Sequence, residues 1–290
     1  MTSSSPWLKA ILVVALFALS FLVFLGLKQV TKDPVTADPK ATPEQLMSWL
    51  NEWNQGVLAM DRYEFAPAAR HFRIVAEGLK NEPAAWANLG IATMNQDNED
   101  AYNQAEVALR RALALSPSHP TALHCLGVLM RHLGNNEEAE KAFRQVLKQD
   151  PHDPSAHYYL ATILLSRSAF EEAETHLKAS IAAEPHQASA IKNLFSLYYR
   201  QGREDQAKAL VDVFQEFQRT ETGNLAGIVY GEMGRYGFIL REFPVEVPAA
   251  AEKPITIAFK VTDLNGRAAT ESRPRTPEAQ LVSGDVWTTT

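Results

Sequence analysis

A single cysteine, Cys125, is present among the 290 residues of this chain. One cysteine excludes a disulfide framework, a zinc site built from thiolates and an attached c-type haem. Cys125 stands in the apolar run LHCLGVLM, so we expect a small core residue rather than a reactive thiol. Basic residues are also few. The 28 Lys and Arg stand against 34 Asp and Glu, a net charge of −6, which excludes a general nucleic-acid binder.

Catalytic motifs are missing as well. The chain has no glycine-rich phosphate loop, no HExxH, no GxSxG and no cysteine beside an orienting histidine. His119 and His124, and again His152 and His157, are five residues apart, and each pair spans a loop and the start of a helix. His119, His152 and His186 lie just after closing prolines, where exposed loops are expected. We therefore expect these histidines to be solvated loop residues rather than metal ligands. We therefore predict no enzymatic activity, no metal, no cofactor and no small-molecule substrate.

One long apolar run lies close to the start of the chain. Residues 10–27 read AILVVALFALSFLVFLGL without a charge and stand between Lys9 and Lys28. At about 1.5 Å per residue, this helix would span roughly 27 Å, close to the ~30 Å hydrocarbon core of a bilayer. We therefore predict a tail over 1–9 and a transmembrane anchor over 10–27 that contacts the lipid bilayer. A cleavable signal peptide and a buried helix are the alternatives.

A linker is expected over residues 28–43, because Pro34, Pro39 and Pro43 deny it a helix interior. The lysines on the two sides of the anchor are nearly balanced, so they do not decide its orientation. A short tail followed by a long body is typical of a signal anchor. We expect a single-pass membrane protein whose soluble body is extracytoplasmic, on the periplasmic side.

The middle of the chain repeats itself. Units that start near residues 49, 83, 120, 154 and 188 align at offsets of 34, 37, 34 and 34 residues. One column is always alanine: Ala68, Ala105, Ala139, Ala173 and Ala207. A second column is large and apolar: Phe72, Leu109, Phe143, Leu177 and Val211. A third column is small until the last unit: Gly56, Gly90, Gly127, Ala161 and Phe195.

Each unit carries two apolar stripes at helical spacing, separated by a turn such as Gly134-Asn135-Asn136. Helices of roughly 12–14 residues are marginal alone in water, so the units must stack. The central units close with Pro117, Pro151 and Pro185. These columns and prolines resemble the tetratricopeptide repeat (TPR) over about residues 49–221. The resemblance implies an all-α fold, a right-handed TPR-like α-solenoid of about five helix hairpins within residues 44–242.

The segment after the fifth unit is expected to cap the solenoid. Residues 224–233 are apolar enough for a short helix, and Gly234-Arg235-Tyr236 repeats the turn of the earlier units, so we predict a half-repeat over 222–242. The sequence YGEMGRYGFIL also resembles the TPR exit of bacterial proteins that continue into FG-GAP or ASPIC/UnbV domains. The 48 residues that follow are too few for a propeller, so no activity is carried over.

The last part of the chain, residues 243–290, is rich in proline and is expected to be an extended tail. Large apolar residues alternate over 255–262 and predict one strand, with a turn at Asn265-Gly266. A lone strand is not stable. We therefore expect it to dock on the solenoid, to add to a partner's sheet or to stay disordered.

The TPR resemblance also implies where a partner binds. In this family the first helix of each unit lines a concave face that usually holds an extended or helical peptide. The positions implied here are Trp53, Val57, Met60, Asp61, Asn95, His124, Arg131, His132, Tyr158, Thr162, Lys192, Tyr199 and Arg200. The later units combine Arg131, Lys192 and Arg200 with tyrosines and no acid, so we expect an acidic or carboxylate-bearing segment. Ordinary solvated helix residues are the alternative interpretation.

The predicted function is that of a membrane-anchored TPR adaptor or scaffold that binds a peptide segment of another protein. Two alternatives stay open. One is a permanent structural subunit of a membrane protein complex. The other is a biogenesis or assembly factor, such as the TPR components of cytochrome c maturation.

Overall fold

The computed structural model describes residues 41–220, 223–247, 261–262 and 268–269. Within these residues, no helix combines the length and the apolar character needed to cross a bilayer. The predicted tail 1–9, the predicted anchor 10–27 and all of the predicted linker before residue 41 lie outside the described residues.

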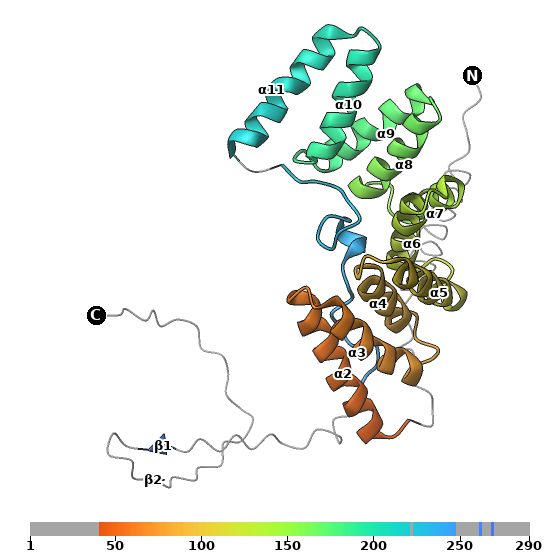
Figure 1. Ribbon diagram of the computed structural model, residues 1–290, viewed down its shortest axis with the longest axis vertical. Coiled ribbons are helices and arrows are strands. Elements are labelled where there is room, and N and C mark those ends of the chain that lie inside the picture. Colours follow the sequence, from red (N-terminus) through yellow and green to blue (C-terminus); the bar gives the residue numbers. More distant parts are fainter. Residues whose placement is uncertain (1–40, 221–222, 248–260, 263–267, 270–290) are drawn as a thin grey trace, which may run out of the picture. The chain divides into compact units, whose positions relative to one another are not determined.

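Ten α-helices pair into five hairpins over residues 43–220 (Figure 1). The first, or A, helices are α2 (Pro43–Asp61), α4 (Pro83–Met94), α6 (Pro120–His132), α8 (Pro154–Ser166) and α10 (Ala188–Arg200). The second, or B, helices are α3 (Phe65–Gly78), α5 (Glu99–Leu115), α7 (Asn136–Gln149), α9 (Phe170–Ala183) and α11 (Glu204–Thr220). Each hairpin also packs on the next, through α3 and α4, α5 and α6, α7 and α8, and α9 and α10. This arrangement confirms the predicted all-α, TPR-like solenoid.

Capping residues fix where the A helices begin. Thr42 forms a capping box in front of α2, and Pro43 takes the first helical position, where its missing N–H costs nothing. The first helix therefore begins at Pro43, earlier than the unit start predicted near residue 49, and takes the last residue of the predicted linker 28–43. Asp153 caps α8 through its side chain, again with proline at the first helical position.

Each hairpin turns through a residue in the left-handed region of backbone space. The φ angles are 58° at Tyr63, 54° at Asp97, 83° at Gly134, 61° at Ser168 and 70° at Gly202. These positions are separated by the same 34, 37, 34 and 34 residues as the sequence units. The backbone therefore repeats in register with the sequence, even where the residue is not the glycine that adopts this conformation without steric cost.

The three sequence columns form the packing between paired helices. The alanine column is buried throughout. A Cβ on Gly127 would lie 2.9 Å from the ring of Phe143, so the small column makes room for the large one. In the fifth hairpin the sizes are exchanged, because Phe195 stands in the small column and Val211 in the large one.

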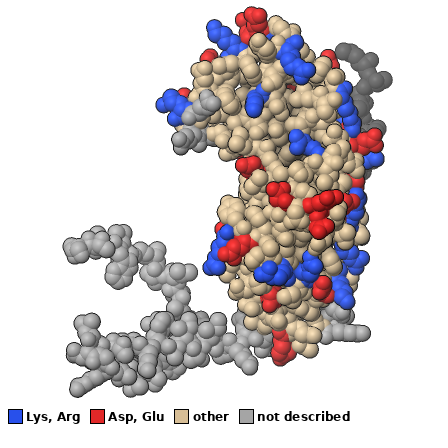
Figure 2. All heavy atoms as spheres, viewed as in Figure 1, with Lys and Arg blue, Asp and Glu red and all other residues tan. Residues whose placement is uncertain are grey.

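The outer surface carries ion pairs that join successive B helices. Arg110 of α5 pairs with Glu138 of α7, and Arg144 of α7 pairs with Glu172 of α9, each at 2.6 Å. Basic and acidic side chains are interspersed over the face seen in Figure 2, which fits this pairing. Exposed pairs of this kind contribute roughly 0–1 kcal/mol each, so the core rather than the charges holds the hairpins together.

Residues 223–247, which we call the strap, contain no α-helix. Apart from the single 3₁₀ turn η1 (Arg235–Gly237), the strap is irregular chain that crosses the A helices (Figure 1, blue). The predictions of a helix over 224–233 and of a half-repeat over 222–242 are therefore wrong. The physical reason is glycine, which disfavours a helix interior and occurs at Gly223, Gly227, Gly231, Gly234 and Gly237. Gly231 and Gly234 also adopt left-handed φ angles of 99° and 91°.

A second, separate unit covers residues 252–290. In it, β1 (Val261–Thr262) pairs antiparallel with β2 (Ala268–Ala269), on either side of the turn predicted at Asn265-Gly266. β1 coincides with the end of the strand predicted over 255–262, and the rest of that strand lies outside the described residues. Its partner strand is local, which was not among the expected alternatives.

Candidate partner-binding site

The inner surface, formed by the A helices where a partner peptide is expected, is in contact with the strap. Each of the helices α2, α4, α6 and α8 bonds the strap main chain through at least one side chain. Tyr159 of α8 donates to the Gly227 carbonyl at 2.7 Å, and His124 of α6 lies 2.7 Å from the Met233 carbonyl. The other two bonds involve α4 and α2 and are made by Asn88 and Trp53.

Asn88 makes the most complete of these contacts. Its Nδ2 donates to the Leu240 carbonyl at 2.8 Å, and its Oδ1 accepts the Leu240 N–H at 2.8 Å. The Asn88 side chain is fully buried, so it has no water to bond in place of the strap. Next to it, Trp53 donates its indole N–H to the Arg241 carbonyl at 2.9 Å and packs edge-on against Phe243.

These four bonding residues occupy neighbouring positions in their sequence units. Trp53 and His124 are the fifth residues of their units, and Asn88 and Tyr159 are the sixth. Because A helices of successive units stack in parallel register, equivalent positions recur along the inner surface. The A helices of the first four units therefore bond the strap from neighbouring positions of successive units.

The start of the strap is fixed to α10. The Ala188 N–H donates to the Asn224 carbonyl at 2.9 Å, and the Asn224 N–H donates to the His186 carbonyl at 2.7 Å. Ser189 then accepts the N–H of Ala226 at 2.9 Å. From there the strap leaves α10 and runs over α8, α6, α4 and α2, so the rest of α10 is not covered by these contacts.

Two arginines of the strap form ion pairs with acidic groups of the solenoid. Arg235 pairs with Asp150 and also bonds Asp153, whose carboxylate is fully buried at the start of α8. Arg241 forms a two-point contact with Asp61 at the end of α2, in which one Nη lies 3.0 Å from Oδ2. The hydrogen bond from Arg241 holds the pKa of Asp61 below its usual range.

Two titratable groups lie buried beneath the strap. Burial lowers the pKa of His124, because the charged imidazolium would lose its hydration; its Nδ1 has no hydrogen-bond partner within the described chain. Burial raises the pKa of the Cys125 thiol to about 12, and its Sγ lies 3.4 Å from the Tyr236 carbonyl. Cys125 is thus a small buried residue rather than a reactive thiol.

The predicted site residues separate into three groups. Trp53, Asp61 and His124 form the first group, and each of them contacts the strap. A second group is used inside the solenoid. Asn95, at the end of α4, bonds the Ile91 carbonyl of that helix, and Arg131 bonds Thr162. His132 packs on Tyr102, Met60 and Tyr158 are buried, and Val57 is half-buried. Lys192, Tyr199 and Arg200 of α10 are exposed.

Asn88, Tyr159 and Asp153 contact the strap and were not predicted. Asn88 and Tyr159 each lie one residue after the position that the resemblance implied, and adjacent helix positions point about 100° apart, so the pattern did not point to them. Nothing in the sequence of the units pointed to Asp153, because its role as a helix cap already accounts for an aspartate there.

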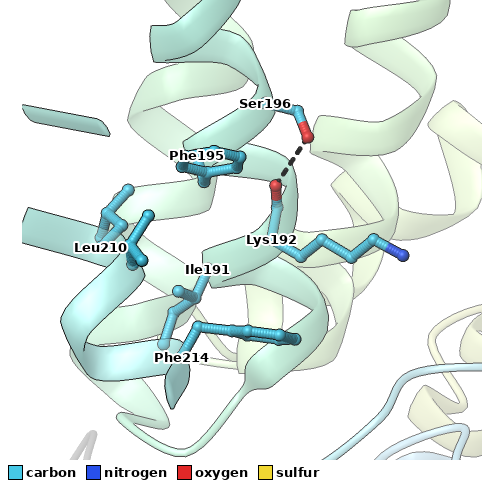
Figure 3. Close-up of a pocket in the computed structure, with 7 residues that line it drawn as sticks. Ile191, Lys192, Phe195, Ser196, Leu210 and Phe214 are labelled. Carbon is cyan, nitrogen blue, oxygen red and sulfur yellow. Dashed lines mark hydrogen bonds between the residues drawn. The ribbon is translucent and has the colours of Figure 1, made fainter. Parts of the chain in front are cut away.

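An apolar pocket of about 250 Å³ lies between α10 and α11. Its apolar side chains gather toward one another, whereas the Lys192 amine points away from them (Figure 3). The lining residues are Ile191, Lys192, Phe195, Ser196, Leu210, Val211 and Phe214. The ring of Phe195 also stacks on Tyr199, with ring centroids 6.0 Å apart. Tyr199 has 71% of its surface exposed, so an apolar strip leads from the pocket to solvent.

The histidines take varied places. His119 caps α6 by accepting the Ala122 N–H, and His152 and His186 are exposed in loops. His157 lies within α8 instead and pairs with His176, with the two Nδ1 atoms 2.8 Å apart. Within the described ranges, no group of three or more His, Cys, Asp or Glu side chains is placed to hold a metal ion.

Comparisons with known proteins agree with this fold. Two tetratricopeptide-repeat family models match the chain, one over residues 131–188 and the other over 164–221. The chain therefore contains TPR repeats, a repeat type rather than a catalytic domain. Neither match concerns FG-GAP or ASPIC/UnbV domains, so that resemblance stays a prediction. No curated protein matches the sequence.

Several solved structures share the fold. A double mutant of MamA from strain RS-1 has a TM-score of 0.54 at 19% identity, covering 61% of this chain and 96% of that one. MamA of Desulfovibrio magneticus RS-1, from residue 41 to its end, has a TM-score of 0.50 at 20% identity, covering 61% and 94%. The pilF protein of Pseudomonas aeruginosa has a TM-score of 0.53 at 19% identity, covering 60% and 77%. At these identities the likeness concerns the fold alone.

Proposed function

We propose that this chain is a membrane-anchored, non-catalytic scaffold that holds a carboxylate-bearing segment of a partner protein against α10. The TPR solenoid supports a role in protein binding, because stacked hairpins create long surfaces without assembling a catalytic group. The anchor rests on the uncharged run over residues 10–27. The proposed orientation, with the body outside the cytoplasm, rests on the short tail before that run.

The observation that carries the choice of α10 is its exposure. The strap contacts the other four A helices but bonds α10 only at its start. Lys192, Tyr199 and Arg200 are exposed, and Tyr199 continues through Phe195 into the apolar pocket. Exposed tyrosine and arginine beside an apolar pocket are typical of protein recognition surfaces. Two cations flanking that strip favour a carboxylate-bearing ligand.

The test uses the full chain in its own membrane, with a photo-crosslinking amino acid at Tyr199. A discrete adduct is expected, and Lys192→Glu combined with Arg200→Glu should reduce its yield by about tenfold, since two exposed charge pairs worth about 0.2–1 kcal/mol each are lost. Lys141→Glu combined with Lys148→Glu, on the exposed side of α7, is the matched charge control. The proposal fails if the adduct from Tyr199 survives the charge reversal, or if a crosslinker at exposed Val107 of α5 traps the same protein equally well.

Membrane anchoring is tested separately. Deleting residues 10–27 should move the protein from the membrane fraction to the soluble fraction after alkaline extraction. Retention of the deleted form in the membrane pellet would contradict the proposed anchor and leave the α10 site untouched.

A further inference from the structure

The inner surface from α2 to α8 meets the strap with acidic side chains. Arg241 of the strap pairs with Asp61, and Arg235 pairs with both Asp150 and Asp153. The strap also carries glutamates, at Glu232, Glu242 and Glu246. None of these three forms an ion pair within the part of the chain that the structure describes. The charge complementarity between the two surfaces therefore depends on arginine alone.

Other polar contacts between the solenoid side chains and the strap are hydrogen bonds to the strap main chain. Trp53, Asn88, His124 and Tyr159 all bond strap carbonyls, and Asn88 also accepts a strap N–H. Every residue of a peptide offers a main-chain carbonyl, so these bonds do not depend directly on the side chains of the ligand. They require that these main-chain groups of the ligand not be used in an α-helix of its own, as is true of the irregular strap.

Side-chain size sets a further requirement. A Cβ on Gly234 would collide with the side chain of Ser155, so the ligand needs glycine beside its first arginine. Met233, two residues before the first arginine, and Ile239, between the two arginines, are almost fully buried against the solenoid. The surface thus fits a segment with a small residue and apolar residues around each arginine.

We propose that the inner surface from α2 to α8 is a binding site for an irregular, glycine-containing segment with two arginines, and that the strap is its resident ligand, displaced when a partner segment of this chemistry binds. This site lies on different helices from the proposed α10 site and selects the opposite charge. A partner is expected to need a high local concentration, because a tethered strap competes at an effective concentration of the order of millimolar.

The test measures binding of a fluorescent peptide with the sequence of residues 223–247 to the detergent-solubilised full chain. In the variant Arg235→Ala with Arg241→Ala, the resident strap is weakened while Asp61, Asp150 and Asp153 are kept. The peptide is expected to bind this variant about tenfold more tightly than the unaltered chain. The reason is that the resident strap of the variant has lost the charge-assisted contacts of its two exposed arginines and competes less strongly. The matched control is the variant Arg110→Ala with Arg144→Ala, which removes two arginines that form ion pairs on the outer surface. This control variant should bind the peptide as tightly as the unaltered chain does.

A double-mutant cycle on the Arg235→Ala, Arg241→Ala chain tests whether the site is specific for the charge of the peptide. Adding Asp61→Asn, and replacing the second arginine of the peptide by alanine, should each lower affinity by about three- to fivefold and together by no more than either alone. Equal binding of the peptide to the weakened and unaltered chains overturns the proposal. So does equal binding of the peptide that lacks both arginines.

A second measurement needs no altered chain, in case the weakened variant does not fold. With the full chain labelled with ¹⁵N, an excess of unlabelled peptide at millimolar concentration should speed hydrogen exchange at the Leu240 N–H, because peptide replaces strap at Asn88. An unchanged exchange rate at saturating peptide would mean that the strap is a permanent part of the core, and would overturn the proposal. Neither outcome bears on binding at α10.

Discussion

Replacing Asn88 by alanine tests how strongly the strap is held to the solenoid. The Asn88 side chain is fully buried and makes both of its 2.8 Å bonds to the main chain of Leu240. Removing it leaves a carbonyl and an N–H without a protein partner, and each group costs about 1–3 kcal/mol when water cannot replace the lost bond. Leu240 is half-buried, so partial hydration holds the sum near 2–3 kcal/mol. Alanine also favours the helix interior by roughly 0.5 kcal/mol, which leaves a net loss of about 2 kcal/mol.

Asn95→Ala supplies the matched control. It deletes the same atoms from the residue that follows the end of the same helix, but Asn95 is half-exposed and its side chain bonds only the Ile91 carbonyl of α4. Its expected cost is below about 1 kcal/mol, because water reaches the carbonyl that is left. Urea unfolding followed by circular dichroism, with a shared m value, measures both changes. If Asn88→Ala destabilises the chain no more than Asn95→Ala, the reasoning from the strap contacts is refuted.

Three further predictions concern the core and the pH dependence of stability. Gly127→Ala should lower the free energy of unfolding by about 1–3 kcal/mol despite the better helix propensity of alanine, because the new Cβ meets Phe143; an unchanged urea midpoint would contradict the packing described. Burial lowers the pKa of His124, so its unfolded form binds a proton first, and stability should fall as the pH drops below about 6.5; His124→Gln should flatten this slope, and an equally steep slope in that variant would argue against it. Hydrogen bonding from Arg203 lowers the pKa of Glu174 to about 2, so its stabilisation should be present above its ordinary pKa of 4.5 and be lost between there and about 2; Glu174→Gln should remove that part of the acid transition in thermal melts, and identical acid transitions would count against the contact.

The hairpins could be predicted from the sequence because their information is local and repeated. The alanine column from Ala68 to Ala207 and the glycine at Gly127 report packing between two helices that are neighbours in the chain. The same periodicity misled at the end of the solenoid. Apolar residues over 224–233 suggested another helix, whereas the closely spaced glycines remove the propensity for one.

The site was only partly predictable, for a different reason. Trp53 and His124, two of the positions that the resemblance implied, bond the strap, but a pattern within one unit does not tell whether a ligand comes from another chain or from this one. The bonds from Asn88 to Leu240 join residues 152 positions apart in the sequence. Contacts of that kind follow from the path of the whole chain, and the expected acidic ligand took no account of Asp61 as an anchor for arginine.

Hydrogen exchange of residues 223–247 in the unaltered full chain is the most direct test of the central claim, that the strap lies bound on the inner surface. The N–H groups of Asn224, Ala226 and Leu240 donate to the solenoid and should exchange far more slowly than in the isolated peptide of the same sequence. Exchange of all three at the rate of the free peptide would contradict the claim.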